Sequence, residues 1–287
     1  MRFITLGCAA LLSAAALPPA SHAQDEKIQK ASKLIEEAGA AYEAGKTQEA
    51  IDLATKAATL DPNNPGAPFV LGSAHLKLRK NAEAIEVFSR VIKLDPKAAG
   101  AYDRRGDAYL KTGKFKEAIA DFDRFLAFRP KLAPDHWRRG IALYYAGRFK
   151  DGVDQFELHR KVNPEDVENS AWHYLCNERA NSPMKARADL IPVTKDARVP
   201  MKEVLELFAG KIKPADVLAA PEKLKLAGED LKEARFYANL YVALYYESEG
   251  DEKKCLEHMT AAAEKYKIGH YMWDVADVHL KLLKAKK

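Results

Sequence analysis

Apolar side chains recur along this chain with the spacing of amphipathic helices. Between residues 24 and 64 they stand at i, i+3, i+4 and i+7, the stripe that a helix turns towards a protein core. The stripe consists of Leu34, Ala38, Ala41, Ala50, Ile51, Ala54, Ala57 and Leu60. Gly45 separates its two halves. The pattern therefore predicts two helices joined by a turn that contains glycine.

The same helix pair returns every 34 residues. Four units follow one another without insertion, over residues 31–64, 65–98, 99–132 and 133–166. Small residues let paired helices approach closely, and proline ends a helix because it has no N–H to donate. The columns that keep this register are Gly72, Gly106 and Gly140; Gly45, Gly113 and Gly147; Glu49, Glu83, Glu117 and Asp151; Ala50, Ala84, Ala118 and Gly152; and Pro62, Pro96, Pro130 and Pro164.

A helix–turn–helix unit of this length with these columns resembles the tetratricopeptide repeat. One unit cannot bury its own apolar face, whereas stacked units can. The resemblance implies an all-α fold, a right-handed superhelical solenoid whose first helices line a concave groove. Phe88, Phe122 and Phe156 share one column of the second helices, and we predict that they belong to the core.

Beyond residue 166 the repeat weakens, although helical spacing continues. In residues 167–228 the pattern predicts a helix over 167–180 and then a proline-rich stretch over 181–200. Short helices are predicted over 201–210 and from Pro214 onwards. Residues 229–287 predict a degenerate fifth repeat, with helices over 230–248 and 252–266 around a turn at Gly250. A final helix over about residues 271–283 is expected to cap the open end of the stack.

The N-terminus has the pattern of a secretory signal peptide over residues 1–23. Arg2 precedes an apolar run over residues 3–17, and Ser21-His22-Ala23 supplies a small-x-small ending. The run is short for a membrane span, and the alternative is an uncleaved N-terminal anchor. We therefore predict an exported protein, periplasmic or secreted, that is soluble after cleavage and has no stable membrane span.

The whole layout resembles the bacterial new lipoprotein I (NlpI) family. The resemblance rests on the four repeats, the stretch Leu205 to Ile212, and the terminal pattern FYxxLYxxLYxxxxGD over residues 236–251. That family comprises homodimeric envelope adaptors that bring a periplasmic tail-specific protease to murein hydrolases and scaffold peptidoglycan synthesis. The resemblance implies these protein partners and a homodimer. The chain lacks the family's lipidation signal, because its apolar run follows Cys8 instead of preceding it.

Composition and motifs argue against catalysis and against nucleic acid. The chain is 47% apolar and 30% charged, with a formal charge of +5, an excess too small to indicate a nucleic-acid-binding face. No HExxH, GxSxG, P-loop or GxGxxG pattern stands in a suitable context. His75, His136 and His159 fall in columns that a stack buries, so we expect packed histidines. We predict a non-enzyme without a cofactor.

Two cysteine–histidine pairs supply the one candidate for metal chemistry. His173 with Cys176, and Cys255 with His258, have the i, i+3 spacing that places two ligands on one helical face. The favoured interpretation is that both cysteines are small core residues, and no metal site is predicted. A metal-binding protein or enzyme built on these pairs is the minor alternative, and a disulfide between Cys176 and Cys255 is left open.

The predicted groove is the better candidate for function. Aromatic and arginine side chains, common in interface hot spots, mix on the first helices of repeats two to four. The predicted partner-binding residues are Phe69, Lys77, Arg104, Asp107, Lys111, Trp137, Arg138, Tyr144 and Tyr145. In the alternative interpretation, Arg104 and Arg138 solvate the surface or pair with Asp103 and Asp107. We predict a protein–protein interaction adaptor of the cell envelope; the alternative is a scaffold for an envelope secretion or polysaccharide-assembly complex.

Overall fold

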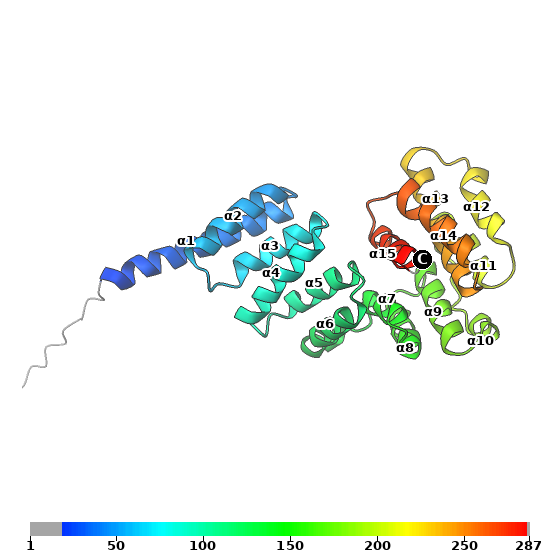
Figure 1. The fold of residues 1–287 in the computed structure, drawn as a ribbon, viewed down its shortest axis with the longest axis horizontal. Coiled ribbons are helices and arrows are strands. Elements are labelled where there is room, and N and C mark those ends of the chain that lie inside the picture. Colours follow the sequence, from blue (N-terminus) through cyan, green and yellow to red (C-terminus); the bar gives the residue numbers. More distant parts are fainter. Residues whose placement is uncertain (1–18, 286–287) are drawn as a thin grey trace, which may run out of the picture. The chain divides into compact units, whose positions relative to one another are not determined.

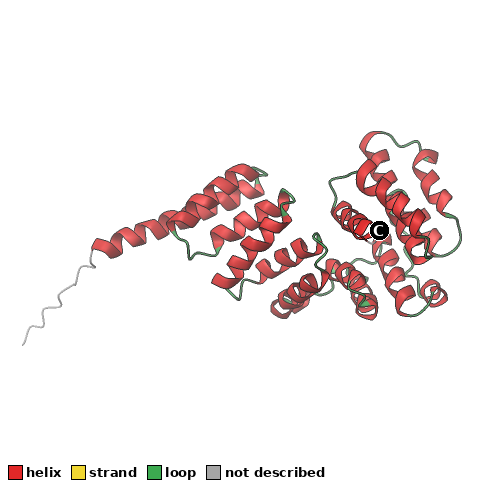
Figure 2. Ribbon diagram, viewed as in Figure 1, coloured by secondary structure: helices red, strands yellow, loops and turns green. Residues whose placement is uncertain are grey.

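The computed structural model describes residues 19–285, whose regular structure is helical (Figures 1 and 2). No strand occurs within these residues, so the predicted all-α fold is confirmed there. The predicted signal peptide lies almost wholly outside the described residues, and export stays a prediction. No helix between residues 19 and 285 is both long enough and apolar enough to cross a membrane. The described residues form two compact units, which divide between Ala74 and His75.

The first unit is built on close contact between two helices. Helix α1 (Pro19–Glu43) packs against α2 (Thr47–Leu60), and α3 (Gly66–Lys77) begins in this unit. Alanine forms the interface because a side chain of one carbon lets the two helix axes approach closely. The buried alanines of these two helices are Ala31, Ala38, Ala41, Ala50, Ala54 and Ala57.

The regular part of the second unit consists of helices that each pack on the next. These are α4 (Asn81–Leu94), α5 (Ala99–Leu110), α6 (Phe115–Phe128), α7 (Trp137–Tyr145) and α8 (Phe149–His159), with a 3-10 turn over Pro130–Leu132. A β-carbon added to Gly106 would lie 2.7 Å from the ring of Phe122, and one added to Gly140 would lie 2.6 Å from the ring of Phe156. The predicted close approach at the small residues and the predicted core position of the phenylalanines are therefore both confirmed.

The turns between paired helices need a left-handed residue. Gly113 and Gly147 have φ values of 75° and 73°, which glycine adopts without a steric penalty. The same column of repeat two holds Arg79, with φ of 56°. A residue with a β-carbon is strained in this conformation. Its side chain must therefore make contacts that offset the strain.

The C-terminal part follows the predicted helix boundaries within a few residues. Its helices are α9 (Val167–Ala180), α10 (Pro183–Ala188), α11 (Met201–Phe208), α12 (Pro214–Lys223), α13 (Gly228–Ser248) and α14 (Glu252–Thr260), which continues as a π-helical segment over Ala261–Lys265. Helix α13 contacts α9, α11, α12 and α14. Residues 236–244 of α13 are all buried, as expected of a helix with neighbours on every side.

The last helix corrects one expectation. Helix α15 (Tyr271–Ala285) packs on α14 and the π-helical segment, but it is not only a cap. Its side chains reach back to repeats three and four, where Tyr271 contacts Asp107 and His279 contacts Tyr145. The sequence could not predict this, because the contacting residues lie more than 130 positions apart.

Candidate functional site

Helix α15 lies against α5 and α7, the first helices of repeats three and four. The Tyr271 hydroxyl donates a hydrogen bond of 2.6 Å to Asp107 Oδ1, and the Tyr271 ring meets Trp137 edge-on with centroids 4.9 Å apart. Further along α15, His279 Nδ1 lies 2.9 Å from the Tyr145 hydroxyl. The apolar part of this contact leaves no room for water; it includes Leu110, Phe115, Tyr145, Val275 and Val278.

A network of charges underlies this contact. Arg138 donates to Asp103 at 2.8 Å and pairs with Asp107 at 3.4 Å, and Lys111 pairs with Asp107 at 2.9 Å. Burial works to raise the pKa of Asp107, but Arg138 and Lys111 outweigh it and hold the pKa below its usual value. Pairing of Arg138 with aspartates across neighbouring repeats, the alternative interpretation of this residue, is confirmed.

The structure corrects the predicted open groove in repeats three and four. The predicted groove residues that contact the chain's own C-terminal helices or the charge network beneath them are Asp107, Lys111, Trp137, Arg138, Tyr144 and Tyr145. The Tyr144 hydroxyl, for example, donates to Glu247 Oε2 on α13 at 2.7 Å. Of the remaining predicted residues, Phe69 and Arg104 are half-buried and Lys77 is exposed.

A cavity of about 350 Å³ lies beside the α15 contact. It is bounded by α7, α8, α9, α13 and the residues that lead into α15. Its aromatic wall consists of Trp137, Phe156, Trp172, Tyr237 and Tyr271, and its polar lining of His159, Asn163, Asp166, Glu168, Asn169 and His270. An aromatic cavity of this size with a few placed polar groups is the usual form of a binding pocket. We take it as the candidate site.

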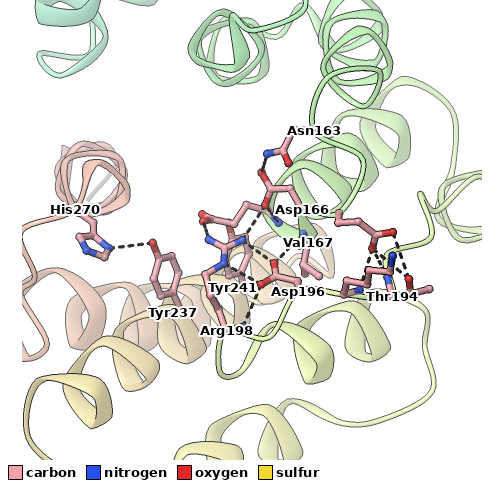
Figure 3. A network of polar contacts seen from close by, with 12 residues as sticks. Asn163, Asp166, Val167, Thr194, Asp196, Arg198, Tyr237, Tyr241 and His270 are labelled. Atoms are coloured by element: carbon pink, nitrogen blue, oxygen red, sulfur yellow. Dashed lines mark hydrogen bonds and ion pairs between the residues drawn. The ribbon is translucent and has the colours of Figure 1, made fainter.

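Two carboxylates of the cavity belong to a cluster around Arg198 (Figure 3). The guanidinium lies 2.9 Å from Asp166, 2.5 Å from Glu168 and 2.6 Å from Asp196. Burial raises the pKa of Glu168, and although Arg198 opposes the shift, the negative charge of Asp166 adds to it. One guanidinium faces three carboxylates, so the cluster carries excess negative charge when all three are ionised.

Local structure fixes the two cavity carboxylates. Asp166 is the N-cap of α9, where its Oδ1 accepts from the backbone N–H of Glu168 at 3.0 Å and its Oδ2 accepts from Asn163 at 3.1 Å. Glu168 Oε2 accepts from the Tyr241 hydroxyl at 2.7 Å. Both side chains are thus held in place before any ligand arrives.

Sequence reasoning missed this site. Asp166 followed by Glu168 is an ordinary helix-capping pattern, and it could have placed both at the start of α9. Nothing in the sequence links them to Arg198, which lies about 30 positions further on, in a loop. Tyr237 and His270, whose Oη and Nδ1 atoms lie 3.4 Å apart, come from α13 and the loop before α15.

The cysteine–histidine pairs have separate surroundings. Cys176 and Cys255 are buried and form no disulfide with each other; Cys176 Sγ packs where a side chain on Gly152 would lie, and Cys255 Sγ is 3.9 Å from His279 Nε2. His173 pairs with Glu157, and His258 contacts Asn239. In residues 19–285, no group of three or more His, Cys, Asp or Glu side chains is placed to hold a metal ion.

Known proteins share both the repeat and the fold. Residues 69–133 match the family model described as a tetratricopeptide repeat. A tetratricopeptide repeat protein from Parabacteroides merdae matches 89% of this chain and 99% of its own, at 18% identity and a TM-score of 0.57. Residues 69–133 of this chain are thus tetratricopeptide repeats. None of the curated proteins matches the chain in sequence.

Two further solved structures resemble this chain. YrrB, described as having an unusual peptide-binding site, covers 67% of this chain and 97% of its own, with 17% identity and a TM-score of 0.56. The first tetratricopeptide repeat domain of Spaghetti (RPAP3), bound to an HSP90 peptide, is 37% identical over 36% of this chain and 81% of its own, with a TM-score of 0.35. The likeness to YrrB concerns the fold alone.

Proposed function

We propose that this protein binds a segment of another protein in the cavity beside α15. The single observation that carries the proposal is the cavity itself, because aromatic rings surround carboxylates already held in place. Aromatic side chains dominate the energy of protein interfaces, and fixed polar groups supply the specificity. YrrB is described as having a peptide-binding site. The shared fold is therefore compatible with such a role.

The cavity suits binding better than catalysis. None of the described residues that line it is a serine, threonine, cysteine or lysine. Burial raises the pKa of the lining tyrosines, Tyr237 and Tyr271, which makes them poor bases and poor nucleophiles at neutral pH. The Asp166 and Glu168 carboxylates are engaged by Arg198. We therefore propose an interaction module without chemistry of its own.

We further propose that the protein acts outside the cytoplasm, on the basis of its N-terminal sequence pattern. Residues 1–23 have the features of a signal peptide, and the layout resembles that of the NlpI family. We propose an exported, homodimeric adaptor of the cell envelope that brings a periplasmic protease or peptidoglycan enzymes together with their targets. Holding two partners on one protein raises their effective concentration.

Affinity capture from an envelope extract tests the proposal with a matched pair of variants. Trp137→Leu alters the cavity wall, whereas Phe115→Leu alters the same α15 contact at a residue that does not line the cavity. We expect a protease or murein hydrolase to be captured by the parent protein and by Phe115→Leu, and to be lost with Trp137→Leu. Equal capture by all three proteins would show that the cavity is not the binding site. No enrichment by the parent would refute the adaptor role.

Export has its own measurement. The protein recovered from the periplasm or the medium is expected to begin at Gln24, as read by N-terminal sequencing. A protein that stays in the cytoplasm with Met1 intact would refute the envelope part of the proposal and leave the binding site untouched.

A further inference from the structure

We propose that the cavity receives a basic side chain, an arginine or a lysine, from the bound protein segment. This inference rests on the proposed function, because it names the chemistry of the partner at that same site. It commits to a charged group of a protein, not to a free small molecule, and it follows from three features of the cavity: its charge, its aromatic wall and its size.

The charge of the cavity favours a cation. Asp166 and Glu168 line it, whereas Arg198, which they share with Asp196, is not among its described lining residues. The described lining holds no lysine and no arginine. The two carboxylates therefore line the cavity, whereas their common counter-ion does not. A buried charge is tolerated when it is paired, and within residues 19–285 only Arg198 forms ion pairs with these three carboxylates.

Charged groups on neighbouring elements agree with this picture. His270, from the loop before α15, pairs with Glu233 of α13 at 3.4 Å, which adds another carboxylate near the cavity. His159 of α8 uses its Nδ1 to contact the carbonyl oxygen of Pro134. Burial raises the pKa of Tyr237, and the charge of Glu168 adds to the shift although Arg198 opposes it. The carboxylates of Glu168 and Glu233 thus place negative charge beside the aromatic rings of the cavity.

The aromatic wall of the cavity also favours a basic side chain. Cations bind over the faces of tryptophan and tyrosine rings, and such contacts are strongest where water is excluded. The chain already uses this contact elsewhere, since Trp273 has the Arg79 guanidinium 4.6 Å and the Lys267 ammonium 4.2 Å from its ring centroid. Trp137 and Tyr271 are fixed at 86° to each other, so a side chain that enters meets a rigid wall.

The size of the cavity limits the occupant. A volume of about 350 Å³ lies at the low end of binding pockets and suits one long side chain with its immediate backbone. Arginine and lysine bring a stem of methylene groups that packs on aromatic rings and a charged end that reaches a carboxylate. Because Asp166 and Glu168 are already in position, little ordering is needed on binding.

Peptide libraries with one fixed central residue test the proposal on the full chain. Seven-residue acetylated peptides carry arginine, lysine, citrulline, glutamate or leucine at the centre and mixed residues elsewhere. Citrulline matters most, because it has the shape of arginine without the charge. Tryptophan fluorescence reports binding, since Trp137 and Trp172 line the cavity. We expect the arginine and lysine libraries to bind at least about tenfold more tightly than the citrulline library.

The variants remove charge while preserving shape. In Asp166→Asn/Glu168→Gln, asparagine still caps α9 and glutamine still accepts a hydrogen bond from Tyr241. We expect the preference for arginine over citrulline to fall to about onefold to twofold. The matched control, Glu222→Gln/Asp277→Asn, removes the same charge at residues that do not line the cavity and should keep the preference. Circular dichroism confirms folding, and Asp166→Asn alone replaces the pair if the double variant unfolds.

Each outcome separates the two proposals. Arginine and citrulline libraries that bind equally, or a preference that survives in the double variant, would overturn the basic side chain and leave peptide binding intact. Failure of every library to bind would refute the proposed function itself. Agmatine, a free guanidinium compound, is the last arm: if it binds as tightly as the arginine library, the site serves a small cation and the protein partner is wrong.

Discussion

Arg79 is the residue whose substitution tests the packing of α15 most directly. It stands in a turn column where two other repeats of its unit place glycine, at φ of 56°. Its Nε atom donates to Asp274 Oδ1 of α15 at 2.8 Å, and its guanidinium lies 4.6 Å from the centroid of Trp273. At Arg79 the strained backbone therefore lowers the stability of the fold, whereas the side-chain contacts raise it.

The free-energy cost of the strained backbone and the stabilisation by the side-chain contacts are similar in size. The left-handed conformation costs a residue with a β-carbon about 1–2 kcal/mol relative to its normal conformation. The Arg79 side chain is 38% exposed, so its ion pair with Asp274 is worth about 1 kcal/mol, and the contact with Trp273 adds about 0.5–2 kcal/mol. Arg79→Ala keeps the strain and loses both contacts, so we expect the free energy of unfolding to fall by about 1.5–3 kcal/mol. Arg79→Gly also relieves the strain, and we expect it to be about 1 kcal/mol more stable than Arg79→Ala.

Urea unfolding followed by circular dichroism measures both free energies. A double-mutant cycle of Arg79→Ala and Asp274→Asn shows whether the contact with α15 accounts for the loss of stability. If the two residues are coupled, the double variant loses less stability than the sum of the two single variants. Equal stability of Arg79→Ala and Arg79→Gly would show that the turn is not strained. Full stability of Arg79→Ala would show that the side chain does not hold α15.

Two further substitutions test the packing and the charges of the repeats. Gly140→Ala brings a β-carbon to 2.6 Å from Phe156, so we expect the free energy of unfolding to fall by about 1–3 kcal/mol, although alanine favours helices; an unchanged value in urea titration would refute the close contact. For Asp103, burial works to raise the pKa, but His136 and Arg138 outweigh it and lower the pKa to about 2 from 3.8. The stabilisation is present above pH 4 and lost as the pH falls through 2, so between pH 5 and 2 the parent protein should lose about 2 kcal/mol more than Asp103→Asn; parallel losses would contradict this.

The sequence determined the elements that depend on local contacts. The 34-residue register predicted the paired helices, their small-residue columns and their core phenylalanines, because residues such as Gly106 and Phe122 that meet in these pairs lie only 16 positions apart. Helix ends followed from capping and proline chemistry, as at Pro214, the first residue of α12. The sequence also predicted Trp137 and Arg138 as residues of a partner-binding groove, whereas in the structure Trp137 meets Tyr271 of α15 and Arg138 pairs with Asp103 and Asp107 of α5.

The tertiary structure alone decided where the surface remains open. Tyr271 meets Asp107 across 164 positions, and Arg79 meets Asp274 across 195. Such contacts have no period and cannot be predicted from the spacing of apolar residues, because they join residues more than 130 positions apart. Tyr237, His270 and Asp166 likewise come together around one cavity only in the tertiary structure. The repeats could be predicted because their partners are neighbours in sequence; the cavity could not, because it forms only when distant helices pack together.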